Sequence, residues 1–94
     1  MQSSPNHVER EVRIVNSQGL HARPVMHFVE IAGRFESRIR VEKNGNGVDG
    51  KSPMEMMLLE ATKGTVLRLI ADGSDAESAV AALAKLIDDK FNEE

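Results

Sequence analysis

The chain has 94 residues, a formal net charge of -3 and no cysteine. Its length fits one domain, which we place at residues 8–94 after a flexible tail at 1–7, and its lack of cysteine excludes disulfides and thiolate chemistry. The small negative charge argues against a nucleic-acid binder. No apolar run nears the roughly 18 residues that span a bilayer, and no signal-peptide pattern opens the chain, so we expect a cytoplasmic domain without membrane insertion.

In chain order, the first predicted elements are a strand and a helix. Apolar and polar residues alternate over 8–15, which is typical of a strand. A polar loop at 16–19 separates it from a segment over about 22–33 in which apolar residues recur at intervals of three and four, as on the buried face of a helix. Pro24 lies in the first turn of this helix, where a missing N–H costs no hydrogen bond.

Two strands and a short helix are predicted next. The alternation over 37–43 indicates a second strand. The two Asn-Gly pairs at 44–47 predict a hairpin, so a brief strand near Val48 should return from it. The sequence Ser-Pro-Met-Glu at 52–55 has the pattern of a capping box and predicts a helix that ends before the Lys-Gly pair at 63–64.

The last predicted elements are a strand and a longer helix. The strand covers 65–71, and a second capping-box pattern at 74–77 predicts the start of a helix whose apolar stripe continues through Phe91. The order is therefore β-α-β-β-α-β-α. Amphipathic helices between half-apolar strands indicate one sheet covered by helices on one side, which is an α+β two-layer open-faced sandwich.

The candidate functional residue is His21, at or just before the start of the helix over 22–33. Unpaired backbone N–H groups and the positive end of the helix dipole meet there and favour an anion such as phosphate. A cation in the first turn opposes the dipole, but the guanidinium of Arg23 can grip an oxyanion. A nucleophilic imidazole beside a phosphate cradle suggests a phosphohistidine.

The other histidines have no comparable setting. A lone histidine at a helix start is more often a cap or a surface residue, so spacing alone does not establish the role of His21. His7 lies near the N-terminal tail, and His27 is six residues from His21, which is not the spacing of a helical metal pair. We interpret both as surface residues and expect no metal site and no cofactor.

Two motifs together resemble the HPr family, the histidine phosphocarriers of the bacterial sugar phosphotransferase system. They are Gly-Leu-His-Ala-Arg-Pro at 19–24 and Asp-Gly-Lys-Ser at 49–52. Ser52 follows His21 by 31 positions, which is the usual separation of the active histidine and the regulatory serine in that family. The resemblance covers about residues 8–91.

The resemblance implies both a topology and a role. The sheet should be antiparallel in the order 1-4-2-3, with three helices on one face. His21 should accept a phosphoryl group through Nδ1 from enzyme I, which is charged by phosphoenolpyruvate, and pass it to an enzyme IIA domain. Arg23 should be the charge partner, and the backbone amides of Ala22 and Arg23 the cradle. The protein would then be a monomeric carrier rather than an enzyme.

Ser52 has two interpretations that the sequence leaves open. As a helix N-cap with Pro53 and Glu55 behind it, its place needs no regulatory role. In the family, an ATP-dependent HPr kinase phosphorylates the matching serine. A regulatory binding protein controlled by phosphorylation of His21 or Ser52, without sugar transport, is therefore the alternative to a carrier.

The expected partner-docking residues are Leu20, Pro53, Met54 and Met57. The helix that begins after Ser52 has more apolar residues than it can bury, so we expect the two methionines to stay exposed beside the histidine, as adaptable contacts. The chain departs from the family pattern at Gln18, where a shorter Asn or Ser is usual, and also at Pro53 and Glu55. The change at Gln18 bears on the orientation of His21, whereas Pro53 and Glu55 lie on the surface that should touch enzyme I and enzyme IIA.

Overall fold

The computed structural model describes residues 6–93. Within this range the chain forms four strands and three α-helices in the predicted order, followed by a short turn, η1. Their bounds are β1 (His7–Arg13), α1 (Ala22–Ala32), β2 (Arg38–Lys43), β3 (Asn46–Asp49), α2 (Pro53–Met57), β4 (Val66–Asp72), α3 (Ala76–Asp88) and η1 (Lys90–Asn92). Positions 1–5 of the predicted tail lie outside the described residues, and β1 already begins at His7.

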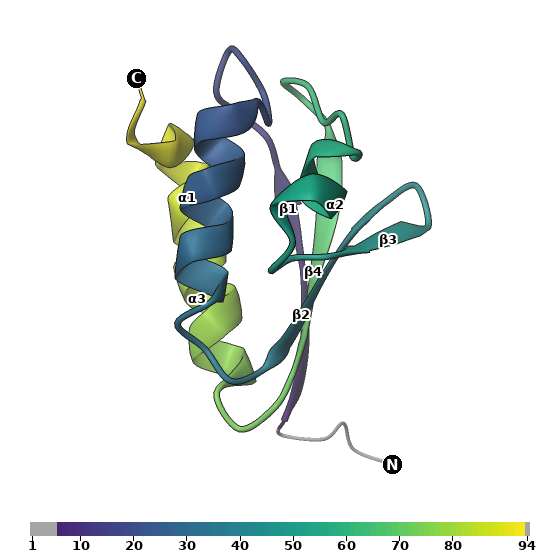
Figure 1. Cartoon of the computed structure of the whole chain (residues 1–94), viewed down its shortest axis with the longest axis vertical. Coiled ribbons are helices and arrows are strands. Elements are labelled where there is room, and N and C mark those ends of the chain that lie inside the picture. Colours follow the sequence, from purple (N-terminus) through teal and green to yellow (C-terminus); the bar gives the residue numbers. More distant parts are fainter. Residues whose placement is uncertain (1–5, 94) are drawn as a thin grey trace.

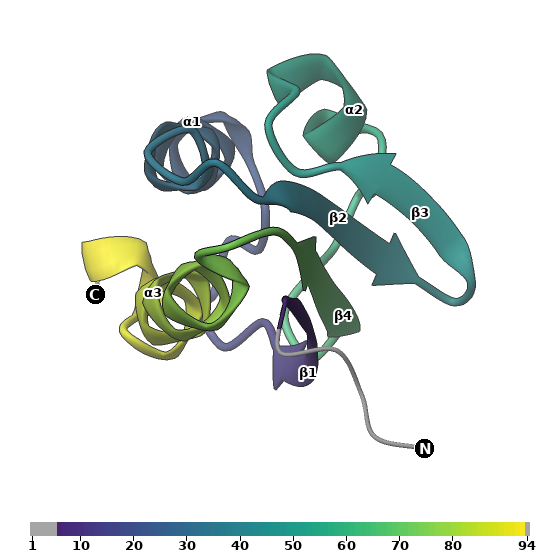
Figure 2. The same ribbon diagram turned by 90° about the horizontal axis from the view of Figure 1, so that it is seen from below.

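The strands form one antiparallel sheet in the order β1-β4-β2-β3, which confirms the predicted topology. Figure 1 shows α1 and α3 side by side along one face of the sheet, with α2 next to α1. In Figure 2, turned by 90°, all three helices again lie on the same side of the strands. The predicted two-layer open-faced α+β sandwich is therefore confirmed.

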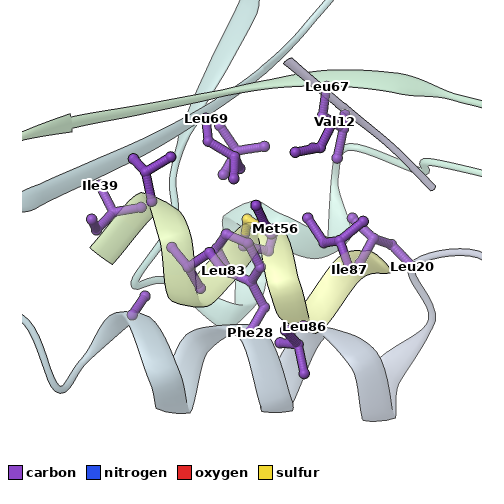
Figure 3. Close-up of a cluster of buried hydrophobic side chains, with 14 of the residues drawn as sticks. Val12, Leu20, Phe28, Ile39, Met56, Leu67, Leu69, Leu83, Leu86 and Ile87 are labelled. Atoms are coloured by element: carbon purple, nitrogen blue, oxygen red, sulfur yellow. The ribbon is translucent and has the colours of Figure 1, made fainter. Parts of the chain in front are cut away.

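The hydrophobic core lies between the sheet and the helices. Leu67, Leu69 and Ala71 of β4 are buried, and the residues between them are exposed or half-buried, as the alternating sequence predicts. Figure 3 shows Leu69 facing Phe28 of α1 and Leu83 of α3. This packing fixes the helices on the sheet and so sets where the start of α1 lies.

The hairpin between β2 and β3 turns at Asn44 and Gly45, as predicted. Lys43 pairs directly with Asn46, so the loop has two residues. Their φ angles of 52° at Asn44 and 85° at Gly45 are both left-handed. A type I′ turn requires these values, and asparagine and glycine adopt them at the least cost.

The predicted capping box at the start of α3 is wrong. Asp75, not Ser74, is the N-cap, and its side chain makes no bond to its own helix. The Asp75 carboxylate instead accepts hydrogen bonds from the Ser37 hydroxyl and from the backbone amides of Glu36 (2.8 Å) and Ser37 (2.9 Å). These bonds, the hydroxyl's first, lower the pKa of Asp75. The carboxylate therefore ties α3 to the entry of β2.

The end of α3 also differs from the prediction. The apolar stripe predicted one helix through Phe91, but α3 ends at Asp88. Lys90, Phe91 and Asn92 follow with φ angles of 57°, 55° and 61°. Left-handed backbone costs L-residues about 1–2 kcal/mol each. The Phe91 side chain is nevertheless 1% exposed and belongs to the core, so it is buried by a reversal of the chain rather than by another helical turn.

Candidate functional site

The segment between β1 and α1 is fixed against the loop that precedes β4. The amide of Ile14 donates to the carbonyl of Thr65 at 2.9 Å, and the amide of Leu20 donates to the carbonyl of Ala61 at 2.8 Å. Between them, Gly19 has a φ of +69°, and a Cβ there would lie 2.6 Å from the oxygen of Ala61 and 2.9 Å from Cα of Thr62. Only glycine fits this close to the main chain of the neighbouring loop, so the contact fixes the position of the backbone that leads to the histidine.

Asn16 holds the same loop from inside. Its side chain is fully buried, and Nδ2 donates to the carbonyl of Gly19 at 2.8 Å and to Oε1 of Glu93 at 3.3 Å. Its Oδ1 is also buried and has no hydrogen-bond partner among residues 6–93. Gln18, where the chain departs from the family pattern, is exposed. Asn16 therefore supplies the buried polar contact beside the histidine, a role that the sequence analysis did not assign to it.

His21 is the N-cap of α1, as predicted. Its backbone is extended, with φ of -93°, and its carbonyl accepts the first helical bond, from the amide of Val25 at 3.0 Å. The amides of Ala22 and Arg23 precede that bond, so the helix offers them no acceptor. The His21 side chain makes no capping bond to them. Two backbone donors thus point out of the positive end of α1.

The His21 ring contacts a carboxylate from the end of the chain. Nε2 lies 3.1 Å from Oε2 and 3.4 Å from Oε1 of Glu93. The side chain of Glu93 is 16% exposed and that of His21 is 43% exposed, so the carboxylate is the more deeply placed group. No spacing rule connects residues 72 positions apart, and the sequence analysis therefore missed Glu93.

Arg23 lies exposed in the first turn of α1. That turn contains no acidic residue, and within residues 6–93 the guanidinium forms no ion pair with a carboxylate. The Arg23 guanidinium therefore adds a positive charge to the start of α1, where the amides of Ala22 and Arg23 have no acceptor in the helix. Such an arrangement favours an anion.

Ser52 is the N-cap of α2, as predicted, but only half of the capping box forms. Its Oγ accepts a bond from the amide of Glu55 at 3.2 Å. The carboxylate of Glu55 accepts from the amide of Asp49 at 3.0 Å, while the amide of Ser52 donates to the carbonyl of Asp49 at 3.1 Å. Glu55 thus closes the turn before α2 instead of capping Ser52, whose hydroxyl has a structural role. Its phosphorylation stays a prediction.

Exposed apolar side chains gather on α2 and just after it. Met54 is 77% exposed, Met57 43% and Leu58 72%. The predicted exposure of the two methionines is confirmed, and Leu58 was missed. With exposed Pro53 they form what we call the α2 apolar surface, and Figure 1 places α2 beside the N-terminal half of α1. Leu20 is a correction: it is 7% exposed and packs in the core, so it offers a partner little surface.

The other two histidines lie outside this site. His7 begins β1 and hydrogen-bonds to Asp72 and to Glu9, and these carboxylates, Asp72 first, raise its pKa. His27 is half-buried in α1 rather than on the surface, and its Nδ1 has no hydrogen-bond partner within the described part of the chain. Among residues 6–93, no three side chains of His, Asp or Glu gather in a way that could hold a metal ion.

Comparison with known proteins agrees with the resemblance drawn from the two motifs. A family model described as the PTS HPr component phosphorylation site matches residues 8–89. Phosphocarrier protein HPr of Neisseria meningitidis serogroup A is 43% identical over 86 residues, which are 92% of this chain and 97% of that protein. The crystal structure of HPr-C-His from Thermoanaerobacter tengcongensis superposes with a TM-score of 0.89 at 46% identity, covering 93% and 98% of the two chains.

The expectation of a monomer is not supported. A crystal structure of an HPr dimer from Thermoanaerobacter tengcongensis is 42% identical, with a TM-score of 0.75 over 99% of this chain and 100% of that one. Proteins this similar therefore include dimers. None of the helices in residues 6–93 combines the length and the apolar character needed to cross a bilayer.

Proposed function

The chain belongs to the HPr family of phosphocarrier proteins, and from this premise we propose that His21 receives a phosphoryl group from enzyme I and passes it to an enzyme IIA domain of a sugar phosphotransferase system. Enzyme I would itself be charged by phosphoenolpyruvate. The protein would act as a substrate of its partners, and it would carry out no reaction on a small molecule by itself.

The observation that carries this proposal is the place of His21 at the uncapped, positive end of α1. A phosphoryl group on the ring would lie next to the amides of Ala22 and Arg23, which have no acceptor in the helix. The Arg23 guanidinium would add a second positive charge. Phosphoryl transfer needs positioning and charge stabilisation more than any other contribution from the protein, and these groups supply both.

The transfer step balances with the residues present. The lone pair of Nδ1 of His21 forms a bond to phosphorus as the bond between phosphorus and the donor atom of enzyme I breaks. In the second transfer the Nδ1–P bond breaks, and its electron pair returns to the ring as the acceptor atom of enzyme IIA bonds to phosphorus. An imidazole can serve in both steps because it is a good nucleophile and, when protonated on its other nitrogen, a good leaving group.

In this proposal, enzyme I and enzyme IIA dock on the α2 apolar surface. Four exposed apolar side chains on one short segment are more than a small domain usually leaves open without use, and unbranched methionines adapt to several partners. Enzyme I and enzyme IIA must each reach His21, so a shared, adaptable surface beside α1 suits both.

A regulatory role for Ser52 is a second, separate part of the proposal, with an HPr kinase as the partner. A phosphoryl group on Ser52 would be attracted by the positive end of α2 but repelled by the nearby carboxylates of Asp49 and Glu55. It would also replace the hydroxyl that now accepts from the Glu55 amide. Phosphorylation of Ser52 should therefore disturb the α2 apolar surface rather than the chemistry of His21.

The deciding experiment is phosphorylation by a purified enzyme I and phosphoenolpyruvate. The wild-type protein and a His7→Ala control should gain one acid-labile phosphate, located on His21 by mass spectrometry, and His21→Ala should gain none. Subsequent addition of enzyme IIA should remove it. If the wild-type protein gains no phosphate on His21, the carrier function is wrong. A phosphate found only on Ser52, after incubation with an HPr kinase and ATP, would favour the regulatory alternative.

A further inference from the structure

The carboxylate of Glu93 bridges two groups of the site. Its Oε1 accepts from Nδ2 of Asn16 at 3.3 Å, and its Oε2 lies 3.1 Å from Nε2 of His21. Asn16 is fully buried, and the same Nδ2 also donates to the carbonyl of Gly19 at 2.8 Å. Both hydrogens of the Asn16 amide nitrogen are thus directed at acceptors. The atom of residue 93 that faces Asn16 must therefore be a hydrogen-bond acceptor, which is the role of Oε1 in Glu93.

The chain reaches this position only through a strained turn. The residues before Glu93 are three consecutive non-glycine residues in the left-handed region, which is sparsely populated for such residues. The turn is held by the buried Phe91 and by bonds from the amides of Asn92 to Asp89 and of Glu93 to Lys90, both 3.0 Å. Strain that persists next to a reactive group is a reason to look for a function there.

A carboxylate at Nε2 determines which ring nitrogen of His21 carries the proton. An ionised carboxylate only accepts hydrogen bonds, so the neutral imidazole facing it holds its proton on Nε2 and leaves the Nδ1 lone pair unprotonated. We propose that Glu93 is a positioning residue, which fixes the Nε2–H tautomer and the orientation of the His21 ring so that Nδ1 is the nucleophile. This role rests on the proposed carrier function.

The same contact assists the transfer in both directions. When Nδ1 bonds to phosphorus, the proton stays on Nε2 and the ring becomes cationic. The Glu93 carboxylate then stabilises the positive charge that forms on the ring, as the aspartate carboxylate does beside the histidine of a catalytic triad. When the phosphoryl group leaves, the electron pair returns to Nδ1, and the departing ring is the neutral imidazole with its proton still on Nε2. No proton has to be taken up from or lost to solvent in either step.

The substitution Glu93→Gln gives a sharp test because it keeps the shape and changes one acceptor into a donor. Asn16 still needs an acceptor, so the glutamine oxygen should face Asn16 and the glutamine NH₂ should face Nε2 of His21. Nε2 would then accept, and the proton would move to Nδ1, which blocks the nucleophile. Glu93→Ala removes the contact without imposing either tautomer. Glu30→Gln, at an exposed position of α1, is the matched control.

The tautomers are read from ¹⁵N NMR spectra of the His21 ring in the full-length protein. We expect the proton on Nε2 in the wild type and in Glu30→Gln, on Nδ1 in Glu93→Gln, and on both in Glu93→Ala. Phosphorylation by enzyme I should slow about three- to tenfold in Glu93→Ala and further in Glu93→Gln. Circular dichroism and thermal melts should show that each variant keeps the fold.

Two outcomes would overturn the proposal. One is a Glu93→Gln variant with its proton still on Nε2, and the other is a proton that has moved to Nδ1 with an unchanged transfer rate. Failure of the carrier function is separate: if the wild-type protein is not phosphorylated by enzyme I at all, the NMR experiment still reports whether Glu93 sets the tautomer.

Discussion

Replacing Gly19 with alanine should destabilise the fold and displace His21, since the glycine combines a left-handed backbone with a close main-chain approach. The φ of +69° would cost an alanine about 1–2 kcal/mol. The added Cβ would lie 2.6 Å from the oxygen of Ala61, which is main chain and cannot rotate away. Separating the two segments would weaken the bond from the amide of Leu20 to Ala61, worth about 0.5–1.5 kcal/mol. We expect a total loss of about 1.5–3.5 kcal/mol.

The control is Gly45→Ala, because Gly45 has a φ of +85° but a Cβ there meets nothing within 4 Å. In both variants the unfolded chain loses the extra conformational entropy of a glycine, so the difference between their stabilities isolates the close approach at Gly19. The assay is urea unfolding, with ¹H–¹⁵N spectra to follow His21. Gly19→Ala should unfold at a lower urea concentration than Gly45→Ala and should shift the His21 signals. Equal midpoints with unmoved His21 signals would refute the reasoning.

Three other substitutions test the tie to α3, the cap of α2 and the docking surface. Since the pKa of Asp75 is lowered in the fold, its carboxylate contributes stability above about pH 4 that is lost as the pH falls. In urea unfolding, the greater stability of the wild type over Asp75→Asn should therefore shrink from pH 7 to pH 3. A difference that stays constant with pH would contradict this. Ser52→Ala should lower the free energy of unfolding by about 0.5–2 kcal/mol, and an unchanged value would mean that its bond to α2 does not stabilise the protein. Met54→Glu should keep the fold and slow phosphorylation by enzyme I, whereas Val66→Glu, at an exposed position of β4, should not; equal rates in the two variants would count against docking at α2.

The features that the sequence predicted correctly are those that neighbouring residues determine. The turn at Asn44 and Gly45 follows from two residues that accept left-handed backbone. The start of α1 at His21 follows from a polar loop that precedes an apolar helical stripe. Ser52 caps α2 through a bond to an amide three residues away. In each case the physical cause lies within one turn of the residue concerned, where a single sequence contains the information.

The features that the sequence did not predict depend on partners far along the chain. Ser74 has the pattern of a cap for α3, but Asp75 replaces it because its carboxylate meets the amides of Glu36 and Ser37, which are 39 and 38 positions away. Glu93 meets His21 from 72 positions away. Local propensity contains no term for such contacts, so they required the structure.

The direction of α3 explains why the carboxylate beside His21 comes from the end of the chain. α1 and α3 run in opposite directions, so α3 ends near the start of α1 (Figure 1). An α-helix continued to Glu93 would advance about 7.5 Å beyond Asp88 along its axis. The left-handed turn replaces that advance at a cost of about 2–4 kcal/mol for Lys90 and Phe91, while Asn92 adopts this backbone at less cost. Burial of Phe91 offsets about 1.5–3 kcal/mol of this cost, and the two hydrogen bonds of the turn offset about 1–3 kcal/mol. Because the cost of the turn and these gains are nearly equal, the position of Glu93 beside His21 depends on the burial of Phe91 as much as on the carboxylate itself.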